Sequence, residues 1–365
     1  MIKITIKIIA FLLLPLSLYS AEKPNVLILF TDDQGTLDLN CYGATDLQTP
    51  NLDTLAEKGV RFTQAYAHTV CCPSRASLLT GRHPQRGGVV SWQQGDRHGS
   101  DSNLGNMAAE EVTIAEALNA AGYDTALFGK WHLGAKVGHG PLDQGFDKFW
   151  GHLSGFIDNY RHCFLHGEGY HDLYDNNQEI FRRDEYFPEL LVEQALEYIE
   201  EDREDPFFMM LAFNLPHYPE QPIGKFANAY ENLEMPRRSY ARVMSTVDDQ
   251  IVTVMDWFPT ILELAQIEAS GLRLDGRSML PVIKRKGAPS AHKVLHFGWQ
   301  GNWAVREGDW KLIGELDKTK GKTNYSLLNL AEKKPEVKNH AKAKPKIVAR
   351  LVKLHEKLEK ELNAN

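Results

Sequence analysis

Two short apolar runs constrain the fold of this chain more than any other feature. They lie at 25–31 (NVLILFT) and 206–213 (PFFMMLAF). Because neither run alternates with polar residues, each is typical of a strand buried on both faces, as in a parallel sheet. A third short strand is expected at 125–129, and amphipathic helices at 112–121 and 187–201 separate the strands. This alternation predicts an α/β sandwich around a mainly parallel sheet.

The pattern changes after residue 288. The last part of the chain has the short segments of an antiparallel sheet, followed by an amphipathic helix at 344–362 that is rich in Lys and Glu. We therefore divide the chain into a main domain at 22–288 and a small C-terminal α+β part at 289–365. A helix is also expected at 49–59, and strands at 60–66, 294–299, 303–306, 310–314 and 325–330.

The N-terminus has the pattern of a secretory signal peptide. Lys3 and Lys7 supply positive charge, 8–18 is apolar, and Ser20-Ala21 offers small residues for cleavage. We therefore expect residues 1–21 to be removed and the protein to be exported, to the periplasm or the extracellular space. An uncleaved anchor helix is the alternative, although the run is short for a membrane span. After cleavage we expect no stable membrane span.

The overall composition is that of a soluble globular protein. The chain is 43% hydrophobic and 24% charged, with a net charge of −7. No basic stripe dominates it, so a nucleic-acid partner is not expected. Its four cysteines are Cys41, Cys71, Cys72 and Cys163. Since adjacent cysteines rarely bond each other, they do not form a disulfide framework, and at least one thiol should have another role.

Polar residues come directly after each of the three predicted strands. Asp32 and Asp33 follow the first, Lys130 and His132 the second, and His217 the third. In open α/β sheets ligands bind beyond the carboxyl ends of the strands, so all three groups should face one crevice. Paired acids after a strand are also common in turns. Together, however, these residues offer carboxylates to a hard cation and several donors to an anion, which suits an anionic ester.

The segment 71–81 (CCPSRASLLTG) combines a thiol with a predicted helix N-terminus. Pro73 is expected at a first helical position, which places Cys71 just before the helix. There the helix dipole and the unpaired backbone N–H groups favour a thiolate. Arg75 lies one turn into the helix on the side of Cys71. A buried cysteine pair before a proline-started helix is the alternative interpretation.

The order Cys-x-Pro-Ser-Arg followed by Thr-Gly resembles the signature of the type I, formylglycine-dependent sulfatases of the alkaline phosphatase superfamily. Further segments at 24–35, 129–134, 216–219 and 252–260 resemble other motifs of that family. The resemblance implies an alkaline-phosphatase-like α/β/α sandwich with a mixed, mainly parallel sheet. It also implies that the enzyme hydrolyses sulfate esters of carbohydrates or aryl alcohols.

The family resemblance assigns the nucleophile and a metal site. Cys71 matches the cysteine that a dedicated maturation enzyme oxidises to formylglycine, whose hydrated form has two hydroxyl groups. One hydroxyl attacks sulfur, and the other drives the release of sulfate. Asp32, Asp33 and the Cys71 derivative match ligands of a divalent cation, most often Ca²⁺, with Mg²⁺ possible.

The resemblance also assigns the groups that handle the sulfate. Arg75 matches the residue that orients and polarises the Cys71 derivative. Lys130 and His217 match residues that bind and neutralise the sulfate group. His132 matches the residue that helps to deprotonate or position the second hydroxyl group. The partner implied is a sulfated small molecule or glycan.

One part of the family pattern is missing. The family takes two further metal ligands from a strand that ends in Ser-Asp-Asn-Gly, and this chain passes from 247–251 straight into 252–256. An internal segment is thus absent near 251/252. Asp158-Asn159 and Asp175-Asn176 lie in the wrong region to replace it, and Asp248-Asp249 look like the polar face of a helix.

Three explanations of the missing segment remain open: an internally deleted gene product, a wrongly assembled gene, or a divergent protein that completes the site otherwise. Two alternative functions follow. The chain is a catalytically impaired sulfatase remnant, or it is a related phosphoester hydrolase. The cysteine signature counts against the second alternative, because such relatives use Ser or Thr as nucleophile.

Overall fold

The computed structural model describes residues 23–63, 65–91, 106–166, 169–248, 292–299, 301–332 and 337–362. The signal peptide, the missing segment near 251/252 and the domain boundary at 288/289 lie outside these residues. Within the described ranges, no helix combines the length and the apolar character needed to cross a bilayer.

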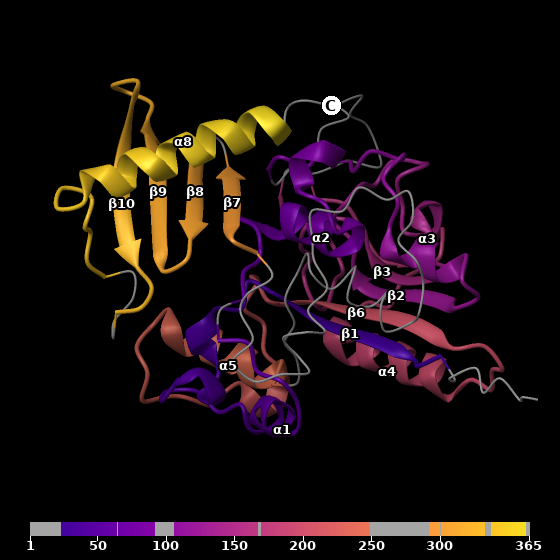
Figure 1. Ribbon diagram of the computed structural model, residues 1–365. Helices are drawn as coiled ribbons and strands as arrows, with labels where there is room; N and C mark the ends of the chain where they lie inside the picture. Colours follow the sequence, from indigo (N-terminus) through magenta and orange to yellow (C-terminus); the bar gives the residue numbers. More distant parts are fainter. Residues whose placement is uncertain are drawn as a thin grey trace, which may run out of the picture.

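The predicted parallel sheet forms the centre of the main domain (Figure 1). Its strands lie in the order β1-β6-β2-β3-β4-β5, and the first four are parallel to one another. The last two form an antiparallel hairpin at one edge. The bounds are β1 (Val26–Asp32), β2 (Asp124–Lys130), β3 (Lys148–His152), β4 (Tyr174–Asp175), β5 (Gln178–Glu179) and β6 (Phe207–Pro216).

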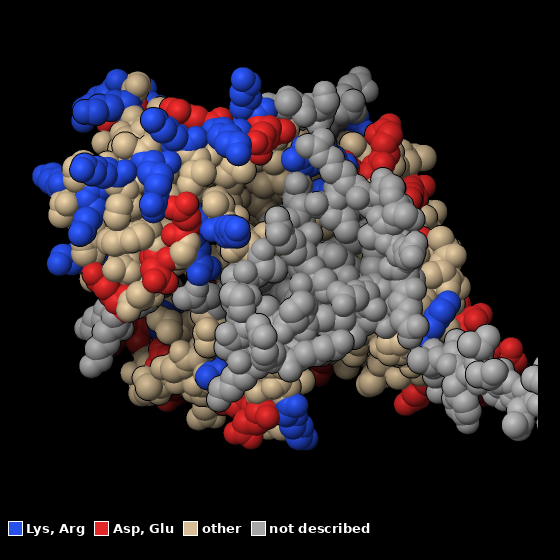
Figure 2. All heavy atoms as spheres, viewed as in Figure 1, with Lys and Arg blue, Asp and Glu red and all other residues tan. Residues whose placement is uncertain are grey.

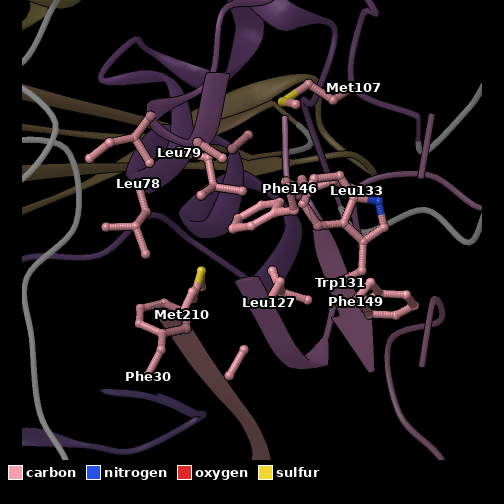
Figure 3. Close-up of a cluster of buried hydrophobic side chains, with 14 of the residues drawn as sticks. Phe30, Leu78, Leu79, Met107, Leu127, Trp131, Leu133, Phe146, Phe149 and Met210 are labelled. Carbon is pink, nitrogen blue, oxygen red and sulfur yellow. The ribbon is translucent and has the colours of Figure 1, made fainter. Parts of the chain in front are cut away.

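Helices cover both faces of this sheet. Helices α2 (Cys71–Thr80) and α3 (Ile114–Asn119) lie on one face, and α4 (Phe187–Glu200) lies on the other (Figure 1). On the α2 face, side chains of β1, β2, β3 and β6 meet α2 in a buried apolar cluster (Figure 3). The labelled residues of that cluster include Phe30, Leu127, Met210, Leu78 and Leu79. The α/β/α sandwich expected from the sequence is thus confirmed.

Two further helices pack together beside the sheet. Helices α1 (Pro50–Lys58) and α5 (Arg237–Thr246) share an apolar cluster through Leu52 and Met244. Asp248 follows α5, and its carboxylate accepts hydrogen bonds from the first backbone N–H groups of α1, at 3.0 and 3.3 Å. This acid therefore caps a helix from a distant segment, rather than lying on the polar face of one.

We expect Asp248→Ala to lower the free energy of unfolding by about 1 kcal/mol, because the N–H groups of α1 lose their acceptor. Urea denaturation of the whole chain measures the effect. Asp202→Ala is the matched control, since it removes an exposed acid from a loop. Equal stability of the two variants would show that the cap contributes nothing.

Three local expectations need correction. Helix α2 begins at Cys71, with Val70 as its N-cap, so Cys71 lies in the first helical turn rather than before it. The strand expected at 60–66 is absent from the described residues of that range, where Tyr66 packs its ring against Phe297 at 5.9 Å. Strand β3 was not predicted, because its sequence is too short to show a period.

The C-terminal part is a four-stranded antiparallel sheet with α8 across one face (Figure 1). Its core joins Val305, Leu312 and Leu327 of the sheet to Leu351 of the helix. Lys and Arg side chains gather on this part (Figure 2), and Lys338, Lys342 and Lys344 are exposed. The bounds are β7 (Val294–Trp299), β8 (Asn302–Glu307), β9 (Trp310–Asp317), β10 (Lys322–Asn329) and α8 (Pro345–Leu362).

Candidate active site

The carboxyl ends of β1 and β2 bring an acid and a lysine into contact. Asp32 ends β1 and Lys130 ends β2, and the Lys130 ammonium donates a hydrogen bond to the Asp32 carboxylate. Arg75 approaches the other oxygen of Asp32 at 3.7 Å and donates a 2.6 Å hydrogen bond to the carbonyl oxygen of Lys130. All three side chains are almost fully buried. Buried charges are stable only when paired, so these three residues depend on one another.

The positive charge of this group exceeds the negative charge. Arg75 and Lys130 carry two cations against the single carboxylate of Asp32. Two of the guanidinium nitrogens, Nε and one terminal nitrogen, are buried without a hydrogen-bond partner among the described residues. Buried polar groups are nearly always satisfied, so these nitrogens indicate a place for an anion with oxygen acceptors.

The thiol of Cys71 lies next to this positive charge. The sulfur atoms of Cys71 and Cys72 and a ring nitrogen of His132 lie within 4.8 Å of one another. The pKa of the Cys71 thiol lies well below its usual range, although burial acts in the opposite direction. The causes are a hydrogen bond from Cys72 and the nearby Lys130 and His132. The position at the start of α2 acts in the same direction. These surroundings therefore favour the thiolate form of Cys71.

We expect iodoacetamide to alkylate Cys71 at pH 6 at least about 10 times faster than Cys41 or Cys163, because an ordinary thiol is almost fully protonated at that pH. Burial raises the pKa of both comparison thiols. Timed alkylation of protein made without a maturation enzyme, followed by peptide mass spectrometry, gives the three rates. Equal rates would contradict the lowered pKa.

His132 is placed to exchange a proton. Its backbone has a φ of 55°, a strained conformation that is often found at functional sites. Its Nε2 lies 3.2 Å from the sulfur of Cys72. Burial lowers the pKa of this histidine, so the imidazole stays neutral and able to accept a proton at neutral pH.

Asp33 and His217 meet at the open side of the group. Asp33 also has a positive φ, of 64°, and its carboxylate lies 3.5 Å from Nε2 of His217. Partial burial and the negative charge of Asp32 raise the pKa of Asp33. The ring of His217 stacks on Phe156, with 5.3 Å between the ring centroids. The structure therefore brings together all seven residues that the sequence singled out.

These residues fit a divalent cation in part. Asp32, Asp33 and Cys71 place negative groups close together, and burial together with the charge of Asp32 raises the pKa of Asp33. Carboxylate oxygens are the donors that Ca²⁺ and Mg²⁺ prefer, but Ca²⁺ takes about six to eight oxygens. The described residues would thus supply only part of the shell.

The two Asp-Asn pairs of the sequence, Asp158-Asn159 and Asp175-Asn176, make structural contacts. Asp158 accepts hydrogen bonds from the N–H groups of Tyr160 and Arg161 in a turn. Asn176 accepts a hydrogen bond from the N–H group of Phe149. Asp158 therefore stabilises a turn, and Asn176 joins the β4–β5 turn to β3.

Sequence reasoning missed His152, which lies behind the charged group. It ends β3 in register with Lys130 and is fully buried, with its ring against Phe187 at 5.4 Å. Neither of its ring nitrogens has a hydrogen-bond partner among the described residues. Burial and the positive charge of Lys130 hold its pKa well below the usual range. His152 ends β3 at the same edge of the sheet as Lys130, so recognition of that strand in the sequence would have pointed to this residue. The strand was not recognised.

Comparison with known proteins gives matches over most of the main domain. The Sulfatase family model matches residues 24–267. The arylsulfatase of Klebsiella aerogenes is 32% identical over 234 residues, which is 61% of this chain and 50% of that protein. The human N-acetylgalactosamine-6-sulfatase is 31% identical over 250 residues, 64% of this chain and 46% of that protein. Human steryl-sulfatase is 40% identical over 158 residues, 41% of this chain and 26% of that protein. The matches thus span about half the length of these relatives or less.

Solved structures agree with the fold over nearly the whole chain. The crystal structure of Ps i-CgsB in complex with k-i-k-neocarrahexaose has a TM-score of 0.80 and 22% identity, and the match covers 94% of this chain and 93% of that one. A structure solved in complex with its substrate D-glucosamine-2-N,6-O-disulfate has a TM-score of 0.75 and 18% identity, with 94% and 99% covered. The family model covers well over half of the sequence, and the fold agrees with it. The chain belongs to the sulfatase family.

Proposed function

We propose that this chain hydrolyses sulfate esters, with Cys71 as the precursor of its nucleophile. The observation that carries the proposal is the position of the Cys71 thiol, at the start of α2 and beside Lys130 and His132. Few other arrangements combine an activated cysteine with a buried excess of positive charge.

The side chains divide the reaction between them. Formylglycine made from Cys71 by a maturation enzyme supplies a hydrated aldehyde as the oxygen nucleophile. Arg75 and Lys130 bind the sulfate oxygens and neutralise the charge that develops on them. His217 contacts the sulfate from the open side. The neutral ring of His132 accepts the proton that must leave for sulfate to be released.

Asp32, Asp33 and the Cys71 position would hold a divalent cation, for which Ca²⁺ is the first candidate and Mg²⁺ the second. When bound, such a cation neutralises sulfate charge. It would also favour the ionised form of Asp33, whose pKa is raised by burial and by the charge of Asp32.

Sulfated carbohydrate is the substrate class that we propose. A wide, shallow hollow of about 450 Å³ lies beside Asp33. Two structural neighbours were solved with k-i-k-neocarrahexaose and with D-glucosamine-2-N,6-O-disulfate. The lining residues are Asp33, Gly35, Asp38, Glu220, Pro236, Arg237 and Tyr240. We further propose that the protein is exported after removal of residues 1–21.

Co-expression with a formylglycine-generating enzyme tests the function. Mass spectrometry of the Cys71 peptide reports conversion, and 4-nitrophenyl sulfate with and without Ca²⁺ reports turnover. We expect conversion, Ca²⁺-dependent turnover, and neither in Cys71→Ala. Conversion without turnover would identify an impaired remnant. Turnover of a phosphate ester by unmodified protein would identify a phosphoester hydrolase.

A further inference from the structure

A second group of metal-binding side chains lies far from the active site in sequence, in the C-terminal part. His296 on β7 and His355 on α8 face each other, with 2.9 Å between Nε2 of the first and Nδ1 of the second. Glu359, one turn further along α8, places a carboxylate oxygen 3.7 Å from the same Nε2. All three ligand atoms lie within 4.8 Å of one another.

We propose that His296, His355 and Glu359 bind a zinc ion. Two imidazole nitrogens and one carboxylate oxygen are a usual donor set for zinc, with a fourth position left for water or another ligand. Zinc bonds of ~2.0–2.1 Å in a tetrahedron place neighbouring ligand atoms about 3.3 Å apart. The observed distances of 2.9 and 3.7 Å lie on either side of that value.

The surroundings of the three ligands support binding. The His296 side chain is only 4% exposed. The indole ring of Trp303 stacks on His355, with 3.9 Å between the centroids, and fixes that ring. The two imidazole rings are thus held in place before any ion arrives.

Two more histidines approach this group from the main domain. The His83 ring lies 5.8 Å from the His296 ring, and the His68 ring lies 5.0 Å from the His83 ring. Nδ1 of His296 and Nε2 of His68 are buried with no hydrogen-bond partner among the described residues. An unsatisfied, histidine-rich contact of this kind suits an ion or its bound water better than an apolar core. The carbonyl oxygen of His68 accepts a hydrogen bond from Ser74 of α2, so these ring contacts lead from the proposed zinc site to the helix that carries Cys71.

Cobalt titration of the full chain tests the proposal, because four-coordinate Co²⁺ replaces zinc and absorbs visible light. Cys71, Cys72 and His132 form a second possible soft-metal site, so the parent protein carries Cys71→Ser and Cys72→Ser. That change also makes the test independent of the proposed hydrolysis. With excess Ca²⁺ present to occupy Asp32 and Asp33, we expect one equivalent of Co²⁺ to bind, Zn²⁺ to displace it, and Zn²⁺ to raise the melting temperature.

Variants at the partly exposed ligands decide the outcome. We expect His355→Ala to weaken binding at least about 100-fold and Glu359→Gln at least about 10-fold, with the melting temperature no longer raised by Zn²⁺. His340→Ala is the matched control, because His340 pairs with Glu332 at 2.8 Å in the same part of the chain. It should bind Co²⁺ like the parent. Lack of stoichiometric binding in the parent, or equal binding by His355→Ala, would show that His296 and His355 only share a hydrogen bond.

Discussion

Replacing Lys130 with Met is expected to lower kcat/KM for a sulfate ester about 1,000-fold and the free energy of unfolding by about 3 kcal/mol. The loss of activity follows from the loss of a cation beside Cys71. The loss of stability has a separate cause. Asp32 stays buried, and its nearest remaining cation is Arg75, at 3.7 Å.

A double variant separates these two effects. Asp32→Asn with Lys130→Met removes both charges of the pair, so most of the lost stability should return. Activity should not return, because both the cation and a proposed metal ligand are absent. Urea denaturation and the 4-nitrophenyl sulfate assay measure the two quantities on the same preparations. If the double variant were no more stable than the single one, Asp32 and Lys130 would not depend on each other.

Much of this site could be predicted from the sequence, because its residues come directly after strands that are recognisable by their apolar sequences. The apolar runs before Asp32 and His217 predicted buried strands, and strand ends in a parallel sheet meet at one edge. Lys130 and His132 were found in the same way. From the sequence, Asp32 was expected to bind a cation and Lys130 an anion. The direct contact between these two residues was therefore not predicted. Side-chain pairing across strands depends on register, which apolar runs do not encode.

The features that were missed depend on long-range contacts. His152 ends a strand of five residues, and only its register with Lys130 places it at the site. His296 and His355 are 59 residues apart in the chain and meet only because α8 packs on the C-terminal sheet. Asp248 resembled a helix residue, and its partners on α1 lie almost 200 residues away in sequence. Local patterns carry no signal for such pairs.

Gly129→Ala is expected to destabilise the chain by at least about 3 kcal/mol more than Gly138→Ala, which serves as the matched control. Both glycines have a positive φ, of 109° and 87°. A Cβ atom at Gly138 would meet nothing within 4 Å, so only the backbone strain applies there. A Cβ atom at Gly129 would lie 2.0 Å from the carbonyl oxygen of Ala212 on the paired strand.

This close approach has a direct consequence for the active site. Gly129 immediately precedes Lys130, and Gly151, next to His152, packs equally tightly against the Gly129 carbonyl. The two glycines therefore let β6, β2 and β3 come together where the charged side chains begin. Because neither neighbour is a flexible side chain, an added methyl group must push the strands apart. Urea denaturation, or loss of soluble protein where Gly129→Ala fails to fold, measures the difference. Equal stability of the two alanine variants would mean that the strands can separate at little cost, and that the position of Lys130 is not set by this contact.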